Sequence, residues 1–489
     1  MFLGIDLGTS SVKAVLIDAA GAVAAEASAP LSLSRPRPLW SEQHPDDWWT
    51  ATRAAVHALD AGARRQVRGV GLAGQMHGAV LLDSQRRVIR PAILWNDGRA
   101  AAACRELERR EPRSRAITGN LAMPGFTAPK LIWLADHEPA AFSRIAHVLL
   151  PKDWLRLQLT GELASEPSDA AGTLWLDVAQ RRWSSPMLAA CGLDERQMPR
   201  LVEGTEVSGE VAPRVAAELG LPADTPVAGG GSDNACGAAG IGVVRDGQAL
   251  VSLGTSGVIF VAGAAFLPDP ERGVHAFCHC LPATWHRMTV TLSGASTLSA
   301  VARMTGAGSE AVLLQEVEGA GVAAPATSRL VMLPYLAGER TPHNDPLATG
   351  VFFGLDGATT RADLGRAALE GVAFALADGL DALEARGGPI AALSVIGGGS
   401  RSRLWGRILA SALQRPLSYH DGGEIGPALG AARLAAIAAG AASTAAACPA
   451  PPVAAVVAPE SALADSLAAR RALFRRLYPD LAPAFRSHA

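Results

Sequence analysis

The chain has 489 residues, of which 49% are hydrophobic and 18% are charged, and its formal net charge at pH 7 is −2. This length exceeds the size at which single cores stop growing, which predicts at least two domains, and the near-zero charge gives no basic field for nucleic acid or anionic membranes. We expect a cytoplasmic protein, because the sequence has no apolar run of about 20 residues, no signal-peptide pattern and only six scattered cysteines.

The first predicted unit is a strand, a polar turn and a second strand. Apolar runs on both sides of the segment Leu7–Ser10 predict the two strands. The same four residues, Leu-Gly-Thr-Ser, recur at 253–256, which is 253 − 7 = 246 positions later and about half of the chain. Such an internal repeat predicts two related domains, at residues 1–242 and 243–489, each opening with this unit.

Both copies of the turn have the composition of a phosphate-binding loop. Glycine lets the backbone approach a ligand, and successive N–H groups with Thr and Ser hydroxyls form a concavity for anions. The first copy adds Asp6, a carboxylate of the kind that Mg²⁺ binds through its waters, whereas the second has Ser252 there. An ordinary β-turn has the same composition, and the repeat is what favours two phosphate loops facing one nucleotide.

Strands and helices alternate through the first half. We expect a strand at 23–29, a helix at 45–59 that begins with Pro45, strands at 67–73, 79–83 and 88–95, and then a helix. Trp48 and Trp49 are expected in the core. The polar clusters at 74–78 and 95–99 follow predicted strands, and ligands of such folds bind beyond strand ends.

The second half has a similar pattern. We expect a strand at 248–252, a helix at 360–385, a strand from Leu393 into the glycine turn 397–399, and a helix at 402–413. The Ala-rich stretch 428–458 predicts a helix followed by a flexible connection, and a final helix at 462–477 is expected to pack on the second domain. Strands followed by helices predict mixed α/β sheets with covered faces.

Three patterns that would indicate other functions are rejected. Residues 69–74 fit G-x-G-x-x-G, but they lie in a strand that another strand follows, which argues against dinucleotide binding. The P-loop pattern G-x-x-x-x-G-K-[ST] does not occur. The His- and Cys-rich segment 275–280 lacks a second ligand pair with metal spacing, so packing is the favoured interpretation.

Several blocks, found in the right order, resemble the FGGY carbohydrate kinases over essentially the whole chain. Residues 125–134 look like the first signature of this family, and residues 350–355 with 363–370 look like the second. The blocks at 75–78, 95–99 and 338–343 are similar to those of the members that phosphorylate D-xylulose. This resemblance implies an α/β, duplicated actin-like (ribonuclease H-like) ATPase fold with a cleft between its two domains.

The resemblance also implies an activity and a set of site residues. The expected reaction transfers the γ-phosphate of ATP to the 5-hydroxyl of a small ketose, most closely D-xylulose. Asp233 is the expected general base, because these kinases carry it in the matching Asp-Asn or Asp-Gln pair, although spacing alone also fits an Asx-turn or a helix cap. The remaining residues are Asp6 for Mg²⁺, Thr9, Ser10 and Lys13 for the phosphates, Gly254, Thr255, Gly257, Gly398 and Gly399 for the nucleotide, and Gln75, Met76, His77, Trp95, Asp97 and Asn234 for the sugar.

Two departures from the family pattern and several alternatives stay open. Ser232 stands where glycine is frequent, and Leu298–Ala300 stands where members acting on xylulose often have Leu-Asp-Trp. The substrate could be another ketose or a polyol, a non-catalytic actin-fold ATPase is less favoured, and a homodimer is plausible by resemblance. Only three of the 44 basic residues are lysines, at 13, 130 and 152, which makes them candidates for places that need a compact ammonium group.

Overall fold

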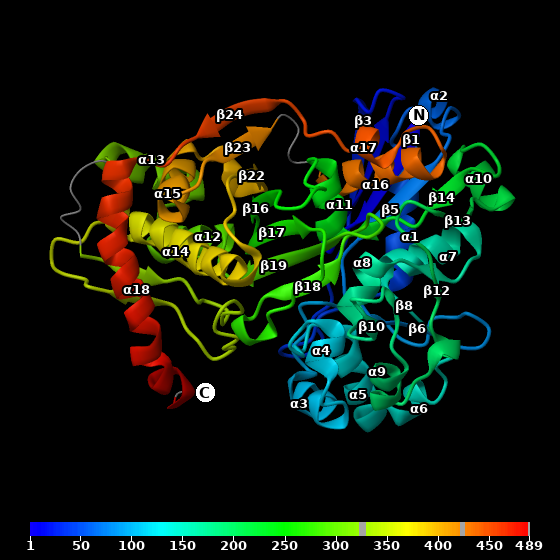
Figure 1. The fold of residues 1–489 in the computed structure, drawn as a ribbon, viewed down its shortest axis with the longest axis horizontal. Coiled ribbons are helices and arrows are strands. Elements are labelled where there is room, and N and C mark those ends of the chain that lie inside the picture. Colours follow the sequence, from blue (N-terminus) through cyan, green and yellow to red (C-terminus); the bar gives the residue numbers. More distant parts are fainter. Residues whose placement is uncertain (322–328, 421–425, 488–489) are drawn as a thin grey trace.

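The computed structural model describes residues 1–321, 329–420 and 426–487. Two lobes lie side by side in Figure 1, and in the residues described each contains a seven-stranded mixed sheet. The path of strands in the first sheet is β13-β14-β5-β1-β2-β3, with β15 paired to β5. The bounds of these strands are β1 Phe2–Leu7, β2 Ser11–Ile17, β3 Val23–Pro30, β5 Val70–Gly74, β13 Val207–Glu210, β14 Pro226–Ala228 and β15 Gly231–Ser232.

The second sheet has the order β18-β19-β17-β16-β22-β23-β24. Its strands are β16 Ala249–Leu253, β17 Gly257–Gly263, β18 His275–Cys278, β19 Trp285–Thr291, β22 Leu393–Ile396, β23 Leu417–His420 and β24 Val453–Val457. The two sheets repeat one topology. In each, a central strand (β1 or β16) pairs antiparallel with the next strand of the chain and parallel with a strand that comes after a crossover helix.

The correspondence extends to the edges of the sheets. β14 is parallel to β5 and is followed along the sheet by the antiparallel strand β13, just as β23 is parallel to β22 and is followed by antiparallel β24. The internal repeat of the sequence therefore corresponds to a repeat of structure, as predicted. β18 is an addition to the second sheet, where it pairs antiparallel with β19.

Helices connect the strands and cover the sheets (Figure 1). α1 begins after His44, and α14 begins with a capping box between Thr360 and Asp363. The helices are α1 Pro45–His57, α2 Ala61–Arg64, α3 Ala101–Arg110, α4 Ser114–Thr118, α5 Thr127–His137, α6 Pro139–Phe142, α7 Pro151–Thr160, α8 Pro167–Ala170, α9 Ser185–Ala190, α10 Pro213–Leu219, α11 Asp233–Gly240, α12 Ala295–Met304, α13 Glu310–Ala320, α14 Arg361–Gly387, α15 Arg403–Leu413, α16 Gly426–Ala438, α17 Thr444–Ala447 and α18 Ser461–Ser487.

Short strands form small sheets outside the two main ones. β6 Val80–Leu82 pairs with β8 His147–Leu149, and β7 Ala92–Ile93 pairs with β4 Glu42–Gln43. The other short pairs are β9 Ala164–Ser165 with β12 Arg200–Leu201, β10 Leu176–Asp177 with β11 Arg182–Trp183, and β20 Val331–Leu333 with β21 Val351–Phe353.

α11 and α16 pack against each other at the junction of the lobes, and α16 also lies on β1 and β5 of the first sheet. Glycine makes this approach possible. A Cβ on Gly430 would lie 1.9 Å from the carbonyl oxygen of Cys236, and one on Gly71 would lie 1.9 Å from that of Ala431. A helix from the second half of the sequence thus completes the first lobe. The domain boundary predicted from the sequence, between residues 242 and 243, remains a proposal.

Most predicted elements are present, but three expectations were wrong. The strand expected at 88–95 is reduced to the two residues of β7, because Pro91 has no N–H for a ladder. The connection expected after α16 is structured, since it contains α17 and the edge strand β24. The final helix does pack on α14 and α15, but it continues to Ser487 past Pro479, and buried Phe485 lies in its last turns.

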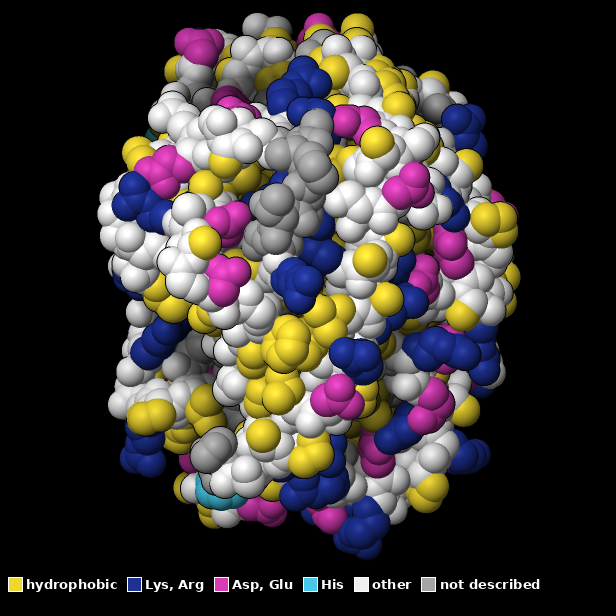
Figure 2. Space-filling view, turned by 90° about the vertical axis from the view of Figure 1, so that its left-hand side faces the viewer, with side chains coloured by type: hydrophobic (Ala, Val, Ile, Leu, Met, Phe, Trp, Pro, Cys, Tyr) yellow, Lys and Arg dark blue, Asp and Glu magenta, His cyan; other side chains and the backbone are white. Residues whose placement is uncertain are grey.

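Within the described residues no helix is both long and apolar enough to cross a bilayer. Trp48 is fully buried, and its indole N–H donates to Gln43 Oε1 at 2.9 Å, while Trp49 is partly buried against the core of the first lobe. The predicted core role of both tryptophans is confirmed. On the face that Figure 2 shows, basic and acidic side chains are interspersed.

Candidate active site

The polar residues predicted for the site converge at one edge of the first sheet. β1, β5 and β15 run parallel, with Leu7 opposite Gly74 and Gly74 opposite Ser232. The residues that follow these strand ends are the first turn, Gln75 and Asp233. Because neighbouring strands are about 4.8 Å apart, the register alone brings these three segments together.

Asp233 is the first residue of α11. Ser232 rather than Asp233 caps this helix, since its side chain accepts from Ala235 N at 3.3 Å, so the unusual serine suits the local turn. Asn234 donates to Asp233 Oδ1 from its backbone N at 2.7 Å and from Nδ2 at 3.0 Å. Burial raises the pKa of Asp233 to about 6 in spite of these bonds, which leaves it ionised at neutral pH but more basic than an exposed aspartate.

Asp6 lies in β1, directly opposite Lys13 of β2. Its Oδ1 is buried and has no hydrogen-bond partner within the described part of the chain. Burial and the charge of Asp233 raise the pKa of Asp6 to about 7, and Lys13 acts in the opposite direction. A divalent cation would satisfy both the orphaned oxygen and the pair of carboxylates, so these residues fit Mg²⁺.

Hydrogen bonds from neighbouring residues hold the first turn in place. Gln75 N donates to the carbonyl oxygen of Leu7 at 2.9 Å, and Gln43 Nε2 donates to that of Thr9 at 2.7 Å. The Thr9 hydroxyl donates to Gln75 Oε1 at 2.9 Å and accepts from Trp95 Nε1, also at 2.9 Å. Thr9 thus links the predicted phosphate turn to two predicted sugar residues, and Ser10 presents the exposed hydroxyl of this turn.

His77 is held in an uncommon conformation beside this edge. Its φ is 71°, a left-handed value that bulky residues adopt where the surrounding structure enforces it. Lys130 Nζ and Thr127 Oγ1 donate to its carbonyl oxygen at 2.8 and 3.0 Å, and its Nδ1 lies 2.7 Å from the carbonyl oxygen of Gly172. A carbonyl can only accept, so Nδ1 carries the hydrogen.

The imidazole of His77 therefore offers Nε2 as an acceptor. Burial lowers its pKa well below the usual value, which keeps the ring neutral. Met76, the preceding residue, is buried, and Phe126 meets the His77 ring edge-on with 4.7 Å between ring centroids. This set of one aromatic wall, one thioether and one neutral imidazole suits a polyhydroxylated ligand.

Asp97 and Asn234 are already engaged by neighbouring groups. Asp97 Oδ2 accepts from Ser41 N at 2.6 Å, and Arg99 donates to both of its carboxylate oxygens, at 2.9 and 2.7 Å. The Asn234 side chain faces Asp233. The geometry places both residues at the site, and their contact with a sugar stays a prediction.

Two cations beside the sugar residues were not assigned from the sequence. Lys130 is buried beneath His77, and the charge of Arg340 contributes to lowering the pKa of both Lys130 and His77. Arg340 follows β20 and belongs to the second half of the chain. The rarity of lysine was the signal for Lys130, whereas Arg340 was visible only as part of a family block.

The second turn is backed by a helix rather than by glutamine side chains. The carbonyl oxygen of Gly254 accepts from Ala295 N at 2.8 Å, and that of Thr255 accepts from Ser296 Oγ at 2.6 Å. Both donors belong to the first turn of α12. Thr255 is exposed, and Gly257 begins β17 in close contact with Thr291.

The glycine turn after β22 adjoins the second phosphate turn. Gly397 has φ 90°, and a Cβ there would lie 2.8 Å from the carbonyl of Leu253. A Cβ on Gly399 would also lie 2.8 Å from Leu253, whereas Gly398 faces open space. The structure thus brings the two predicted nucleotide segments together. Leu298 of the unusual Leu298–Ala300 block is buried in the core of the second lobe.

The His- and Cys-rich segment is used in packing. The rings of His275 and Phe277 stack with centroids 5.6 Å apart, and His275 Nδ1 lies 3.1 Å from Asn120 Oδ1. Cys278 Sγ donates to the carbonyl oxygen of Val178. These contacts agree with the interpretation made from the sequence.

Comparison with known proteins gives a consistent result. Models of the N-terminal and C-terminal domains of the FGGY family of carbohydrate kinases match residues 1–240 and 249–439. Over 485 residues the chain is 52% identical to the xylulose kinase of Escherichia coli strain K12, with 99% of each chain covered.

Solved structures agree. A protein described as a xyloylose kinase from Brucella ovis is 49% identical with a TM-score of 0.94, and the xylulose kinase from Rhodospirillum rubrum is 32% identical with a TM-score of 0.91, each covering 99% of both chains. Together with the duplicated sheets, these matches confirm the predicted two-domain fold of the actin-like ATPase type.

Proposed function

The chain belongs to the FGGY family of carbohydrate kinases, and on that premise we propose that it transfers the γ-phosphate of ATP to the 5-hydroxyl of D-xylulose. The products are D-xylulose 5-phosphate and ADP. The observation that carries this proposal is the convergence of Asp233, Asp6 and the Gln75–His77 segment at parallel strand ends. Relatives at 52% and 49% identity that are described as kinases of this ketose support the choice of sugar.

Asp233 is the proposed general base. Phosphoryl transfer asks the protein mainly to position the two substrates, to neutralise charge and to receive the hydroxyl proton. A carboxylate with its pKa raised to about 6 is ionised at neutral pH and accepts the proton more readily than an exposed aspartate does. The oxygen of the sugar then bonds to the γ-phosphorus as the bond to the β-phosphate oxygen breaks.

Asp6 is the proposed metal residue, and Thr9, Ser10 and Lys13 are proposed for the phosphates. Mg²⁺ bound there would neutralise charge on the β- and γ-phosphates during transfer. Lys13 stands across the strand pair from Asp6, and Ser10 has the exposed hydroxyl of the turn. Thr9 would act through its backbone, because its hydroxyl already binds Gln75 and Trp95.

The sugar subsite is proposed to contain Gln75, Met76, His77, Trp95, Asp97 and Asn234. His77 Nε2 would accept a hydrogen bond from a sugar hydroxyl, since the neutral ring donates only from Nδ1. A site that bonds each hydroxyl rejects analogues that leave its polar groups unpaired. Asp97 would act indirectly, by fixing Arg99 and the segment after Trp95.

The nucleotide is proposed to bind against the second lobe, at Gly254, Thr255, Gly257, Gly398 and Gly399. The second turn and the glycine turn adjoin each other, so one ligand can contact both. We further propose that the enzyme works in the cytoplasm on ATP and a small ketose, without a nucleic-acid or membrane partner. A homodimer is the assembly to test, because the family resemblance suggests it.

A coupled ADP-release assay with a panel of ketoses and polyols tests the proposal. We expect D-xylulose to give the highest kcat/KM. A higher kcat/KM with ribulose, a deoxy sugar or a polyol would change the assigned substrate but leave the assigned reaction, phosphoryl transfer from ATP, unchanged. If no sugar stimulates ADP release above background, the kinase assignment for this chain is wrong.

A further inference from the structure

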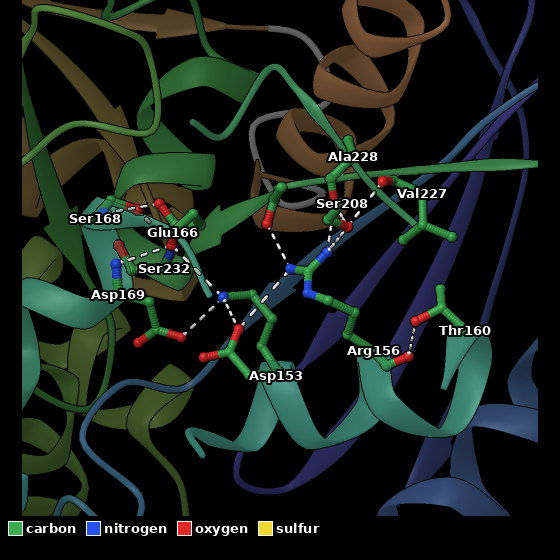
Figure 3. A network of polar contacts seen from close by, with 12 residues as sticks. Asp153, Arg156, Thr160, Glu166, Ser168, Asp169, Ser208, Val227, Ala228 and Ser232 are labelled. Atoms are coloured by element: carbon green, nitrogen blue, oxygen red, sulfur yellow. Dashed lines mark hydrogen bonds and ion pairs between the residues drawn. The ribbon is translucent and has the colours of Figure 1, made fainter. Parts of the chain in front are cut away.

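Five charged side chains are buried together beside the segment that precedes Asp233, and Figure 3 labels Asp153, Arg156, Glu166 and Asp169 among them. They come from α7 and from the segment around α8, and each is 0% exposed. The five residues are Lys152, Asp153, Arg156, Glu166 and Asp169. Burying charge is costly unless the geometry is good, so a cluster of this kind calls for an explanation other than stability.

Lys152 is the centre of the cluster. Its Nζ lies 2.5 Å from Asp153 Oδ1, 3.3 Å from Asp169 Oδ2 and 3.6 Å from Glu166 Oε1. Burial raises the pKa of Asp169 well above its usual value, and the charge of Lys152 acts in the opposite direction.

One end of the loop before Asp233 is bonded to this cluster, and the other is bonded to Ser168, which Glu166 of the cluster holds. At one end, Arg156 Nη1 donates to the carbonyl oxygen of Ala228 at 2.7 Å, and Nη2 donates to that of Gly229 at 2.6 Å. At the other end, Ser232 N donates to Ser168 Oγ at 2.9 Å. In Figure 3 the Arg156 guanidinium points toward the strand end and Ser168 lies beside Ser232.

The cluster also fixes Ser168 itself. Glu166 accepts from Ser168 N at 2.7 Å and from Asp169 N at 2.9 Å, and so caps α8. A chain of contacts therefore runs from Lys152 through Glu166 and Ser168 to the residue immediately before Asp233. Ser232 is both the end of this chain and the cap of α11.

We propose that Ser168 and Arg156 are positioning residues for Asp233, holding the two ends of its loop so that its carboxylate faces the acceptor hydroxyl. This proposal rests on the proposed function, because it assumes that Asp233 is the base. Displacing a reacting group by about 1 Å costs about 10²-fold in rate. Loss of either anchor should therefore lower kcat while the Gln75–His77 part of the sugar subsite, which follows β5, stays in place.

The test is Ser168→Ala, with Ser411→Ala as the matched control. Both serines are buried, at 0% and 1% exposed, and the hydroxyl of each accepts from a backbone N–H distant in sequence, but Ser411 accepts from Glu460 N at 3.1 Å in the second lobe. We expect Ser168→Ala to lower kcat about ten- to a hundred-fold, with KM for D-xylulose within about two-fold. We expect Ser411→Ala to keep kcat within about three-fold, even if its melting temperature falls as much as that of Ser168→Ala.

Three results would overturn the proposal: unchanged kcat in Ser168→Ala, an equal loss of kcat in both variants, or a higher KM with kcat retained. Arg156→Lys gives a second measurement, since a lysine keeps the charge but lacks the planar fork whose two nitrogens bond the two carbonyl oxygens, and it too should lower kcat more than KM changes. Failure of the proposed function is distinguishable, because it would show in the unmodified enzyme as the absence of sugar-stimulated ADP release.

Discussion

The two Leu-Gly-Thr-Ser turns are the same sequence placed in two different surroundings. The first lies beside Asp6 and Asp233, and its Thr9 hydroxyl is tied to residues of the sugar subsite. The second has Ser252 in place of the carboxylate and adjoins the glycine turn at Gly397. The same turn sequence occurs twice, and under the proposed assignment the neighbouring residues give metal and transfer chemistry to the first copy and nucleotide binding to the second.

In both turns, neighbouring groups donate hydrogen bonds to the backbone carbonyl oxygens. In the first, Gln75 and Gln43 donate to them, and in the second the N-terminal N–H and hydroxyl groups of α12 do so. A carbonyl oxygen facing a phosphate would repel it. Occupying these oxygens from behind leaves each turn with donors toward its ligand, which is what an anion-binding turn needs.

The largest expected difference between the two turns concerns Asp233, beside the first one. If the first lobe alone supplies the base, Asp233→Asn should lower kcat about 10³-fold, in the middle of the range for general-base catalysis. KM for ATP should stay within about two-fold, because nucleotide binding is assigned to the other turn in our proposal. Steady-state ADP release measures both. A kcat within ten-fold of the unmodified enzyme would remove Asp233 as the base.

The stability of this variant gives an internal control. Burial raises the pKa of Asp233, so the folded state binds its proton more tightly than the unfolded chain does. Ionisation of Asp233 therefore lowers stability as the pH rises from its ordinary pKa of 3.8 to about 6, so the cost is complete above about pH 6 and absent only below about pH 4. Asp233→Asn should raise the melting temperature at pH 8 and change it less at pH 5.

The carboxylate of the first turn and its counterpart in the second can be compared directly. Asp6→Asn should lower kcat about 10²-fold and raise the Mg²⁺ concentration needed for half-maximal rate, since charge on the transferring phosphate is no longer neutralised there. Ser252→Ala, at the matching position, should change kcat less than about three-fold. Equal Mg²⁺ dependence in the two variants would contradict the division between the turns.

Local patterns were enough to predict much of the fold and the site. The repeated turn, the central strands and the helices at α1, α14 and α15 follow from short-range periodicity and capping residues. Gln75 was predicted because it follows a strand, Asp6 because it adjoins the repeated turn, and Asp233 because the family carries its base in the matching Asp-Asn pair.

What the sequence did not predict depends on contacts between distant residues. The packing of α16 on the first sheet needs Gly71 and Gly430 to face carbonyl groups far away along the chain. The left-handed backbone of His77 is enforced by Lys130 and Gly172, and no local pattern encodes it. The buried cluster around Lys152 consists of charged residues that hydropathy alone would place on the surface, although the rarity of lysine had singled out Lys152 itself.

The pH dependence of kcat/KM tests the assignment of the general base to the first lobe. Only ionised Asp233 can accept a proton, and its pKa is raised to about 6. At saturating Mg²⁺, kcat/KM for the sugar should be level above about pH 7 and fall about ten-fold for each unit below pH 6. Initial rates in a series of buffers at constant ionic strength measure it. A level profile down to pH 5 would show that Asp233 does not control the rate.

The smallest effect is expected in the second lobe, at Gly398. A Cβ there meets no atom within 4 Å, so Gly398→Ala should leave folding intact, unlike a change at Gly397 or Gly399. If the nucleotide passes over this residue, the added methyl group should raise KM for ATP about five-fold and leave KM for the sugar unchanged.

Gly357→Ala is the control for this measurement. A Cβ at Gly357 also meets no atom within 4 Å, and the residue lies in the loop between β21 and α14, apart from the predicted nucleotide segments. We expect it to leave both KM values unchanged. An unaltered KM for ATP in Gly398→Ala would show that the nucleotide does not pass over the glycine turn. Equal increases of KM for ATP in both variants would indicate a general effect on the second lobe. A rise in KM for the sugar instead would reverse the roles given to the two halves of the molecule.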